Sequence, residues 1–292
     1  LIDVKAAQTA IANIAKKLKL SIEAMAEGII QLAVIQMTSS VKEISVMRGI
    51  DPRDFTLVAF GGAGPMHGAL IAEELGMARV VIPPLPGNFS AFGLLVADTR
   101  HDVAKTEIMQ LEFSDISDIR RALIPLENEA RERLRADGFA NDQIRIEASL
   151  DMRYVGQSFE LNIMLPAELT DTEELMEAFH KAYEQRYSHR DQGSGEVIAF
   201  RVTGFGNMDR PPLPSVLGGN ELAASIRDTR QVIFNSVSRE TTVYWREDLP
   251  LNTTFGGPAI IEERGSTTVV PPNFNVLMDP TGSLVLDRKT TK

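Results

Sequence analysis

One central segment constrains the fold of this chain more than any other stretch. An apolar run over residues 56–60 is followed by a glycine-rich turn and by Pro65, which suits the first turn of a helix. A second apolar run occupies residues 79–84. Strand, helix and strand in such quick succession predict a parallel βαβ unit with a right-handed crossover.

The glycine-rich turn is a candidate ligand loop. Gly61, Gly62 and Gly64 let the backbone approach a bound molecule closely, and the free N–H groups of a helix N-terminus suit phosphate or carboxylate. The spacing matches neither G-x-G-x-x-G nor a Walker loop with its Lys-Ser/Thr pair. A tight strand-to-helix turn that binds nothing fits the same residues, so both interpretations stay open.

Composition limits the classes of partner. The 292 residues suffice for about two domains, and a formal net charge of −10 argues against nucleic acid and anionic membranes, because phosphate binding needs clustered Lys and Arg. No stretch approaches the ~20 uninterrupted apolar residues of a membrane span, and no signal-peptide pattern is present at the start. We therefore expect no nucleic-acid and no membrane partner.

Cysteine usage and the first residue add two further expectations. The chain has no cysteine, which excludes disulfides, thiolate zinc sites and thiol nucleophiles, and fits a cytoplasmic localisation. It begins with Leu1 rather than Met and enters a helical pattern at once. This start suggests a processed protein or the C-terminal piece of a longer polypeptide.

Helical periodicity marks several further segments. Apolar residues at helical spacing predict an amphipathic helix over 3–18 and a long core helix over 21–47, with Ser21 as its N-cap. A charged amphipathic stretch over 115–137 predicts a helix that Pro125 kinks or splits. Ser90 is expected to cap a short apolar helix.

The sequence pattern changes from helical periodicity to strand-like alternation beyond about residue 140. Period-two alternation over 144–154 and 158–165 predicts a hairpin, and from Glu196 onward nearly every segment is typical of a short strand. The Pro- and Gly-rich section 207–219 is the best candidate linker.

These patterns define a fold class and a division into domains. They predict an α/β part over 1–110 and a β-rich α+β domain over 111–292.

The residues alone do not specify a reaction. The four histidines lack H-x-x-x-H or H-E-x-x-H spacing, so no self-contained metal centre is expected, and there is no G-x-S-x-G elbow. His67 lies in the first helical turn after the glycines, where it suits a polar or anionic ligand, but packing under the loop explains it equally well. His189 in a polar turn is a weaker candidate ligand contact.

Motifs in order along the chain carry a resemblance. The sequence resembles the hydantoinase A / 5-oxoprolinase family, which includes ATP-hydrolysing N-methylhydantoinases and acetone and acetophenone carboxylase subunits. The segments that carry it are 51–55, 57–67, 72–76, 83–87 and 90–95, followed more weakly by 153–160, 183–187, 257–262 and 266–272.

The resemblance implies a fold and an activity. It implies the end of an actin-like ATPase lobe followed by a C-terminal β domain, with Gly61, Gly62 and Gly64 facing the nucleotide and His67 approaching nucleotide or substrate. It further implies ATP and Mg²⁺ as cofactors of the complete enzyme, a hydantoinase B-type partner subunit, and opening of a cyclic amide such as a hydantoin or 5-oxoproline. The family's Asp-x-Gly-Gly-Thr-like phosphate loops do not occur here, so we expect this chain alone to be inactive.

Two rival functions stay open. The first is a carboxylase subunit of similar descent, in which bicarbonate and a ketone replace the cyclic amide. The second is a non-catalytic binding or assembly module, with residues 140–292 as a docking surface.

Overall fold

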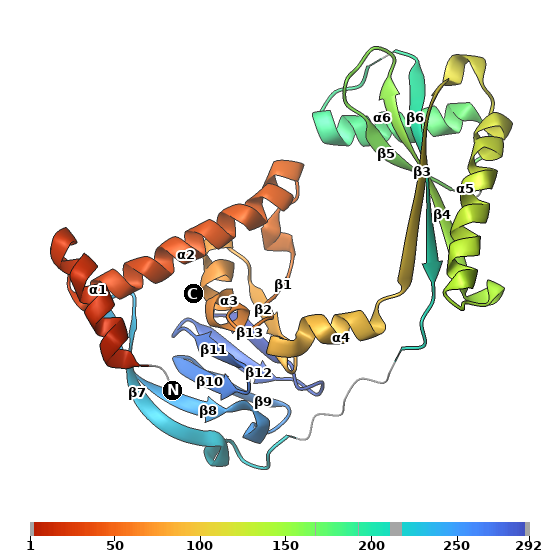
Figure 1. Ribbon diagram of the computed structural model, residues 1–292. Coiled ribbons are helices and arrows are strands. Elements are labelled where there is room, and N and C mark those ends of the chain that lie inside the picture. The colour runs from red at the N-terminus through yellow and green to blue at the C-terminus, as the bar shows by residue number, and fades with distance from the viewer. Residues whose placement is uncertain (1–2, 167, 192, 211–217, 290–292) are drawn as a thin grey trace. The chain divides into compact units, whose positions relative to one another are not determined.

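The computed structural model describes residues 3–166, 168–191, 193–210 and 218–289, and these form two compact units (Figure 1). The first unit combines Leu1–Leu94 with Pro212–Lys292, and the second comprises Leu95–Pro211. This division differs from the expected one at residue 110, because strand pairing returns the C-terminal segment to the N-terminal unit. Periodicity along a sequence does not show which distant strands pair.

The N-terminal part of the first unit is helical and contains the predicted βαβ unit. Its elements are α1 (Val4–Leu18), α2 (Ile22–Ile44), β1 (Leu57–Val58), α3 (Gly64–Leu75), β2 (Arg79–Ile82) and α4 (Phe89–Val96), the last of which continues into the second unit. Strands β1 and β2 pair in parallel, as predicted. The Ser21 hydroxyl accepts the Ala24 N–H, which confirms the predicted N-cap of α2.

The C-terminal part of the first unit is built from strands. They are β7 (Ile226–Phe234), β8 (Val237–Trp245), β9 (Thr253–Gly256), β10 (Ala259–Glu263), β11 (Ser266–Val270), β12 (Phe274–Met278) and β13 (Leu284–Arg288). One sheet has the order β1-β2-β13-β12-β9 and a second has the order β11-β10-β8-β7. Figure 1 shows the C-terminal strands in blue beside β2.

A single core joins the βαβ unit to these strands. Side chains of β2, β12 and β13, among them Ile82, Phe274 and Leu286, are fully buried in one cluster with Ala72 of α3. At Gly68 of α3 a side-chain Cβ would lie 2.9 Å from the Cβ of Ala59. Glycine at that position therefore lets the helix pack closely on the strand that leads into the glycine turn.

The second unit is a four-stranded antiparallel sheet with two helices. Its elements are β3 (Thr99–Gln110), α5 (Ile116–Ala136), β4 (Ile144–Tyr154), β5 (Leu161–Leu165), α6 (Thr172–Tyr187) and β6 (Gly195–Gly206), and the sheet order is β3-β6-β4-β5. The predicted hairpin is the β4–β5 pair. Residues of α5 and α6 share one buried cluster with the central strands, so both helices contribute to the same core.

Three local expectations need correction. Helix α4 begins at Phe89, so Ser90 lies inside its first turn and is not its N-cap. Helix α5 is continuous through Pro125, so the proline does not split it, because five buried side chains along its length outweigh one lost backbone hydrogen bond; that Pro125 kinks the helix stays a prediction. Helix α2 ends at Ile44 and is followed by a separate 3-10 turn, Val46–Arg48. Of the predicted linker 207–219, residues 211–217 lie outside the described residues.

One helix of the described chain is long and apolar enough to cross a membrane by length and composition. It is the helical segment Ile22–Arg48, which comprises α2 and the 3-10 turn after it, and 11% of its apolar window is buried. The sequence expectation counted uninterrupted apolar runs, whereas isolated polar residues interrupt this helix without making it polar. By itself this property does not distinguish a membrane span from a helix that packs on other protein, so the absence of a membrane partner stays a prediction.

Candidate functional site

The predicted glycine turn connects the end of β1 to the start of α3. Gly61 has φ +88°, and nothing lies within 4 Å of the place where a Cβ would be, so glycine is needed there for its backbone conformation and not for space. Its N–H donates to the carbonyl of Pro86 at 2.7 Å. Gly61 therefore shapes the turn, while its own donor is already used.

The N-terminus of α3 is open. Ala63 is its N-cap residue, and no side chain of the described residues caps the helix, whereas α1, α2, α5 and α6 are each capped by an Asp or Ser. The N–H groups of Gly62, Ala63 and Gly64 donate to no acceptor within the described part of the chain. Unpaired N–H groups at the positive end of a helix form a favourable position for an anion.

Two further loops lie against the glycine turn. The hydroxyl of Ser266 donates to the carbonyl of Gly62 at 3.2 Å. A Cβ on Gly87 would lie 3.1 Å from the carbonyl oxygen of Gly265, so these two backbones approach each other closely. We call the glycine turn 61–64, the 3-10 turn Pro86–Asn88 and the hairpin turn 264–265 the three-loop surface.

The second and third loops were not singled out as site residues from the sequence. The Pro-Gly pair Pro86-Gly87, four residues after the end of β2, is a signal that could have indicated the second loop. The hairpin turn has no comparable signal, because its proximity to the glycine turn depends on pairing between segments about 200 residues apart.

His67 lies in the first turns of α3 and is partly exposed. Its Nδ1 is 3.0 Å from the carbonyl of Ala63, so in the neutral ring Nδ1–H donates to this oxygen and Nε2 is left as an acceptor. The ring is thus oriented from the glycine turn itself. That His67 contacts nucleotide or substrate stays a prediction.

The other three histidines have local partners. His101 Nε2 lies 2.6 Å from Asp137, His180 Nδ1 lies 2.5 Å from the hydroxyl of Tyr154, and His189 Nδ1 lies 3.0 Å from the carbonyl of Tyr187. Within the described residues no three His, Asp or Glu side chains are grouped so that they could hold a metal ion. His189 stays a candidate ligand contact without support from this geometry.

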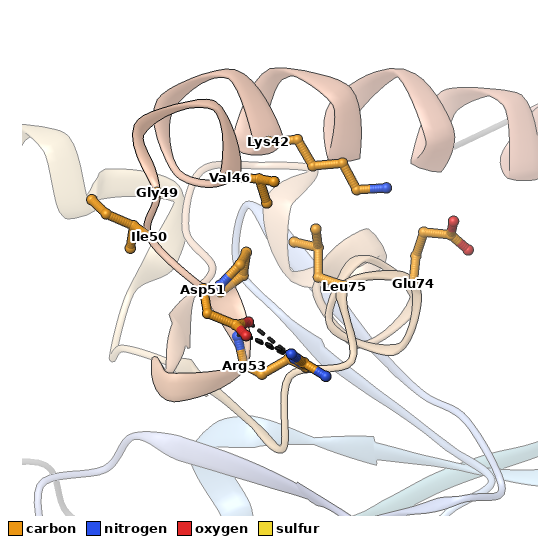
Figure 2. Close-up of a pocket in the computed structure, with 9 residues that line it drawn as sticks. Lys42, Val46, Gly49, Ile50, Asp51, Arg53, Glu74 and Leu75 are labelled. Carbon is orange, nitrogen blue, oxygen red and sulfur yellow. Dashed lines mark hydrogen bonds and ion pairs between the residues drawn. The ribbon is translucent and has the colours of Figure 1, made fainter. Parts of the chain in front are cut away.

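A surface hollow of about 450 Å³ lies near the C-terminal ends of α2 and α3 (Figure 2). Figure 2 shows Lys42 and Glu74 at its sides and the Asp51–Arg53 ion pair below them. The hydrogen bonds from Arg53 lower the pKa of Asp51 to about 2. The Arg53 stem also lies 3.4 Å from where a Cβ on Gly76 would be.

This hollow is distinct from the three-loop surface. Asp51 and Arg53 precede β1 and Gly76 follows α3, whereas the glycine turn joins the other ends of these two elements. The Asp-Pro-Arg motif contributed to the resemblance. Within it Arg53 forms an ion pair with Asp51, and the Arg53 stem packs against Gly76 at the end of α3.

Comparison with known proteins adds independent evidence. Residues 1–103 match the hydantoinase/oxoprolinase family, and residues 109–287 match the hydantoinase/oxoprolinase C-terminal domain. The alpha subunit of caprolactamase from Pseudomonas jessenii is 34% identical, covering 94% of this chain and 41% of that protein. 5-Oxoprolinase 1 of Arabidopsis thaliana is 27% identical, covering 92% of this chain and 21% of that protein.

The beta subunit of acetone carboxylase from Xanthobacter autotrophicus is 29% identical, covering 92% of this chain and 40% of that protein. Among solved structures, the ATP-dependent caprolactamase from Pseudomonas jessenii superposes with a TM-score of 0.87 at 33% identity, over 99% of this chain and 43% of that one. A nucleotide-free acetone carboxylase structure superposes with a TM-score of 0.72 at 26% identity, over 98% of this chain and 43% of that one.

These matches confirm the predicted fold class, a mixed α/β part followed by a β-rich C-terminal part. They include chains that are subunits of larger, ATP-dependent enzymes. The chain spans about two fifths of the length of the caprolactamase and acetone carboxylase subunits that it matches. On the family matches, which together cover nearly all of its length, the chain belongs to the hydantoinase/oxoprolinase family.

Proposed function

We propose that this chain is the C-terminal part of an ATP-dependent cyclic amidohydrolase, which opens a hydantoin, 5-oxoproline or related lactam ring. In this proposal the three-loop surface faces the nucleotide, with the α3 N-terminus directed at one of its phosphate groups. The reaction class rests on the family matches, and the observation that places the nucleotide is the open N-terminus of α3 behind the glycine turn, with three unpaired backbone N–H groups. Four other helices of the same chain have a side-chain cap at this position.

The residues present fit a polyanionic ligand. Backbone N–H groups at the end of a helix bind phosphate without a charged side chain, so the negative net charge of the chain is compatible with nucleotide binding. Gly62 has ordinary φ and no close neighbour nearer than 3.5 Å to its Cβ position, which leaves the turn accessible to a bound molecule. His67 offers Nε2 as an acceptor beside the same turn.

The chemistry explains why a lactamase would use a nucleotide. An unstrained cyclic amide is a poor electrophile, and ATP, accompanied by Mg²⁺, supplies the phosphoryl group that activates the amide oxygen. In this scheme Gly62 and Gly64 bind and orient the nucleotide through their backbone. His67 then accepts a hydrogen bond from the nucleotide or the substrate.

The whole enzyme is larger in this proposal. Because the chain spans about two fifths of the relatives' subunits, the phosphate loops would come from further polypeptide, and a hydantoinase B-type subunit would complete the active site. The same reasoning predicts that residues 1–292 alone bind Mg-ATP weakly and hydrolyse none. Cytoplasmic localisation is part of this proposal.

One other enzyme class has support. The similarity to the acetone carboxylase beta subunit favours a ketone carboxylase, in which bicarbonate is activated in place of the amide. Both classes use the three-loop surface in the same way. They differ in substrate and not in the nucleotide site.

The nucleotide site is tested by one substitution and its matched control. Ala63 has helical dihedrals, so in Ala63→Asp the new carboxylate contributes mainly its charge at the helix N-terminus. Repulsion of phosphate should weaken Mg-ATP binding by about tenfold. Ala63→Asn has the same size without the charge and should bind as the parent protein does. The measurement is calorimetric titration of the full product of the gene.

The outcomes separate the functions. Equal Mg-ATP affinity in Ala63→Asp and Ala63→Asn would show that the nucleotide does not bind at this loop. If the parent protein binds no Mg-ATP, the result favours the non-catalytic binding module. If binding is present, turnover of a panel of hydantoins, 5-oxoproline and caprolactam, against acetone with bicarbonate, distinguishes hydrolase from carboxylase.

A further inference from the structure

Arg246 is a buried cation that the proposed nucleotide contacts do not use. It begins a 3-10 turn after β8 and is 4% exposed. Its Nη1 donates to Glu263 at 2.7 Å, and its Nη2 donates to the carbonyls of Ile82, Pro83 and Gly282, each at 2.9 Å. One nitrogen carries two N–H groups, so the three carbonyls share them. The guanidinium thus joins two backbone segments and one carboxylate.

Two of these connections lead to the glycine turn. The end of β2 continues into Pro86, whose carbonyl accepts the Gly61 N–H. Glu263 ends β10 and pairs across the hairpin with Ser266, whose hydroxyl donates to the Gly62 carbonyl. Both loops that contact the glycine turn therefore begin at residues held by one guanidinium.

Stability alone is a poor explanation for this pair. Burial lowers the pKa of Arg246 and raises that of Glu263, and in each case burial outweighs the attraction between the two charges. Buried ion pairs are often replaced by apolar residues of similar volume without loss of stability. What a forked guanidinium adds is a fixed geometry among the groups it contacts.

We propose that Arg246 and Glu263 are positioning residues, which fix the spacing of the three-loop surface and so hold the α3 N-terminus ready for nucleotide. The inference rests on the proposed function. Both residues are buried and act through Gly61 and Gly62, not by contact with the ligand. A turn held in its binding geometry loses less conformational freedom when the ligand binds.

Three variants test this arrangement. The double variant Arg246→Met, Glu263→Met removes both charges and keeps an apolar filling of similar length. Arg246→Lys keeps the charge, but its single nitrogen cannot serve Glu263 and the carbonyls in the same geometry. The matched control is Arg79→Met, which breaks the exposed ion pair between Arg79, at the opposite end of β2, and Asp287 of β13.

Two quantities are measured on the full product of the gene in its native assembly. They are the Mg-ATP affinity, by calorimetric titration, and amide hydrogen exchange in segments 60–66, 84–89 and 263–267. The double variant should bind about tenfold more weakly, and the hydrogen-bonded amides of these segments only, among them those of Gly61 and Asn88, should exchange about tenfold faster. Arg246→Lys should change both in the same direction, and Arg79→Met should change neither.

Two results would contradict the positioning role of Arg246 and Glu263. A folded double variant with the parent's affinity and exchange would overturn the inference, as would exchange that rises evenly through the first unit, which a merely structural pair would cause. If the double variant does not fold, Arg246→Lys decides by the same two measurements. If the parent protein binds no Mg-ATP, the proposed function fails, and the exchange pattern still decides whether the pair positions the loops.

Discussion

The glycine turn of the first unit and the aromatic cluster of the second unit both contain motifs that carried the family resemblance, yet they use their polar groups in opposite ways. In the glycine turn, three backbone N–H groups have no acceptor within the described residues. In the aromatic cluster, defined by Tyr154, Phe179 and Tyr183, the rings lie 4.8 to 5.9 Å apart and the polar groups are paired.

The pairing in the aromatic cluster is extensive. The Tyr154 hydroxyl donates to the carbonyl of Asp191 and lies 2.5 Å from His180, and Gln157 donates to the hydroxyl of Tyr183. Open donors suit a ligand, whereas satisfied ones stabilise a fold. The comparison teaches that two motifs of one family can differ in role: the second packs a core, whereas the first leaves donors open, as the proposed nucleotide contact requires.

The largest expected effect tests the packing role. Phe179 is fully buried in the core of the second unit, so Phe179→Ala should lower the free energy of unfolding by about 3–5 kcal/mol. Mg-ATP affinity at 25 °C should be unchanged in the folded protein. Denaturant unfolding measures the first quantity, and Phe113→Ala, at a side chain that is 76% exposed, is the control with an effect near zero. A large loss of affinity in folded Phe179→Ala would break the comparison.

A smaller effect is expected from a single hydroxyl of the cluster. Tyr154→Phe removes the donor to Asp191 and the partner of His180 while keeping the ring, and should cost about 2 kcal/mol of stability. Thermal unfolding measures this cost. If the variant is as stable as the parent but loses turnover, the cluster has a catalytic role and the contrast with the glycine turn disappears.

Within the glycine turn, two neighbouring glycines should respond differently. Gly61→Ala forces a side chain into φ +88° and should cost about 1–2 kcal/mol. Gly62→Ala meets its nearest neighbour at an ordinary 3.5 Å and should cost less. Unfolding of both variants in denaturant compares them directly. Equal costs would show that the turn conformation differs from the one described.

The smallest effect concerns pH. Burial, helped by the nearby Arg190, lowers the pKa of His180 below its usual value, while Glu177 and Asp191 act in the opposite direction. The unfolded chain therefore takes up the proton first as pH falls, so this contribution to stability is complete above the usual histidine pKa and is lost as pH drops from about 7 towards 5.

The matched variant for the pH effect is His180→Gln. Its stability should fall less steeply than that of the parent protein over this range, as measured by unfolding at several pH values. Identical slopes would mean that His180 is not the group that titrates. Because the other three histidines are present in both proteins, the difference between the two curves isolates one side chain.

The local features of both regions follow from short stretches of sequence. Ser21 caps its helix, the glycines make the turn after β1, and alternation marks the β4–β5 hairpin, because each depends on residues only a few positions apart. The open N-terminus of α3 was partly predictable in the same way, since Ala63 and Pro65 provide neither a cap nor a donor. The expected split at Pro125 was wrong, because side chains of α5 that are buried against other elements hold the helix together.

The sequence by itself thus determined the family, the fold class and the glycine turn as a candidate site. Only the tertiary structure decided that β13 pairs with β2, that Ser266 meets Gly62, and that one guanidinium joins the ends of these segments. The physical reason is the separation along the chain between the residues on which each feature depends. Turns, caps and periodicity depend on neighbours along the chain, whereas a binding surface depends on which distant backbones burial and strand pairing bring into contact.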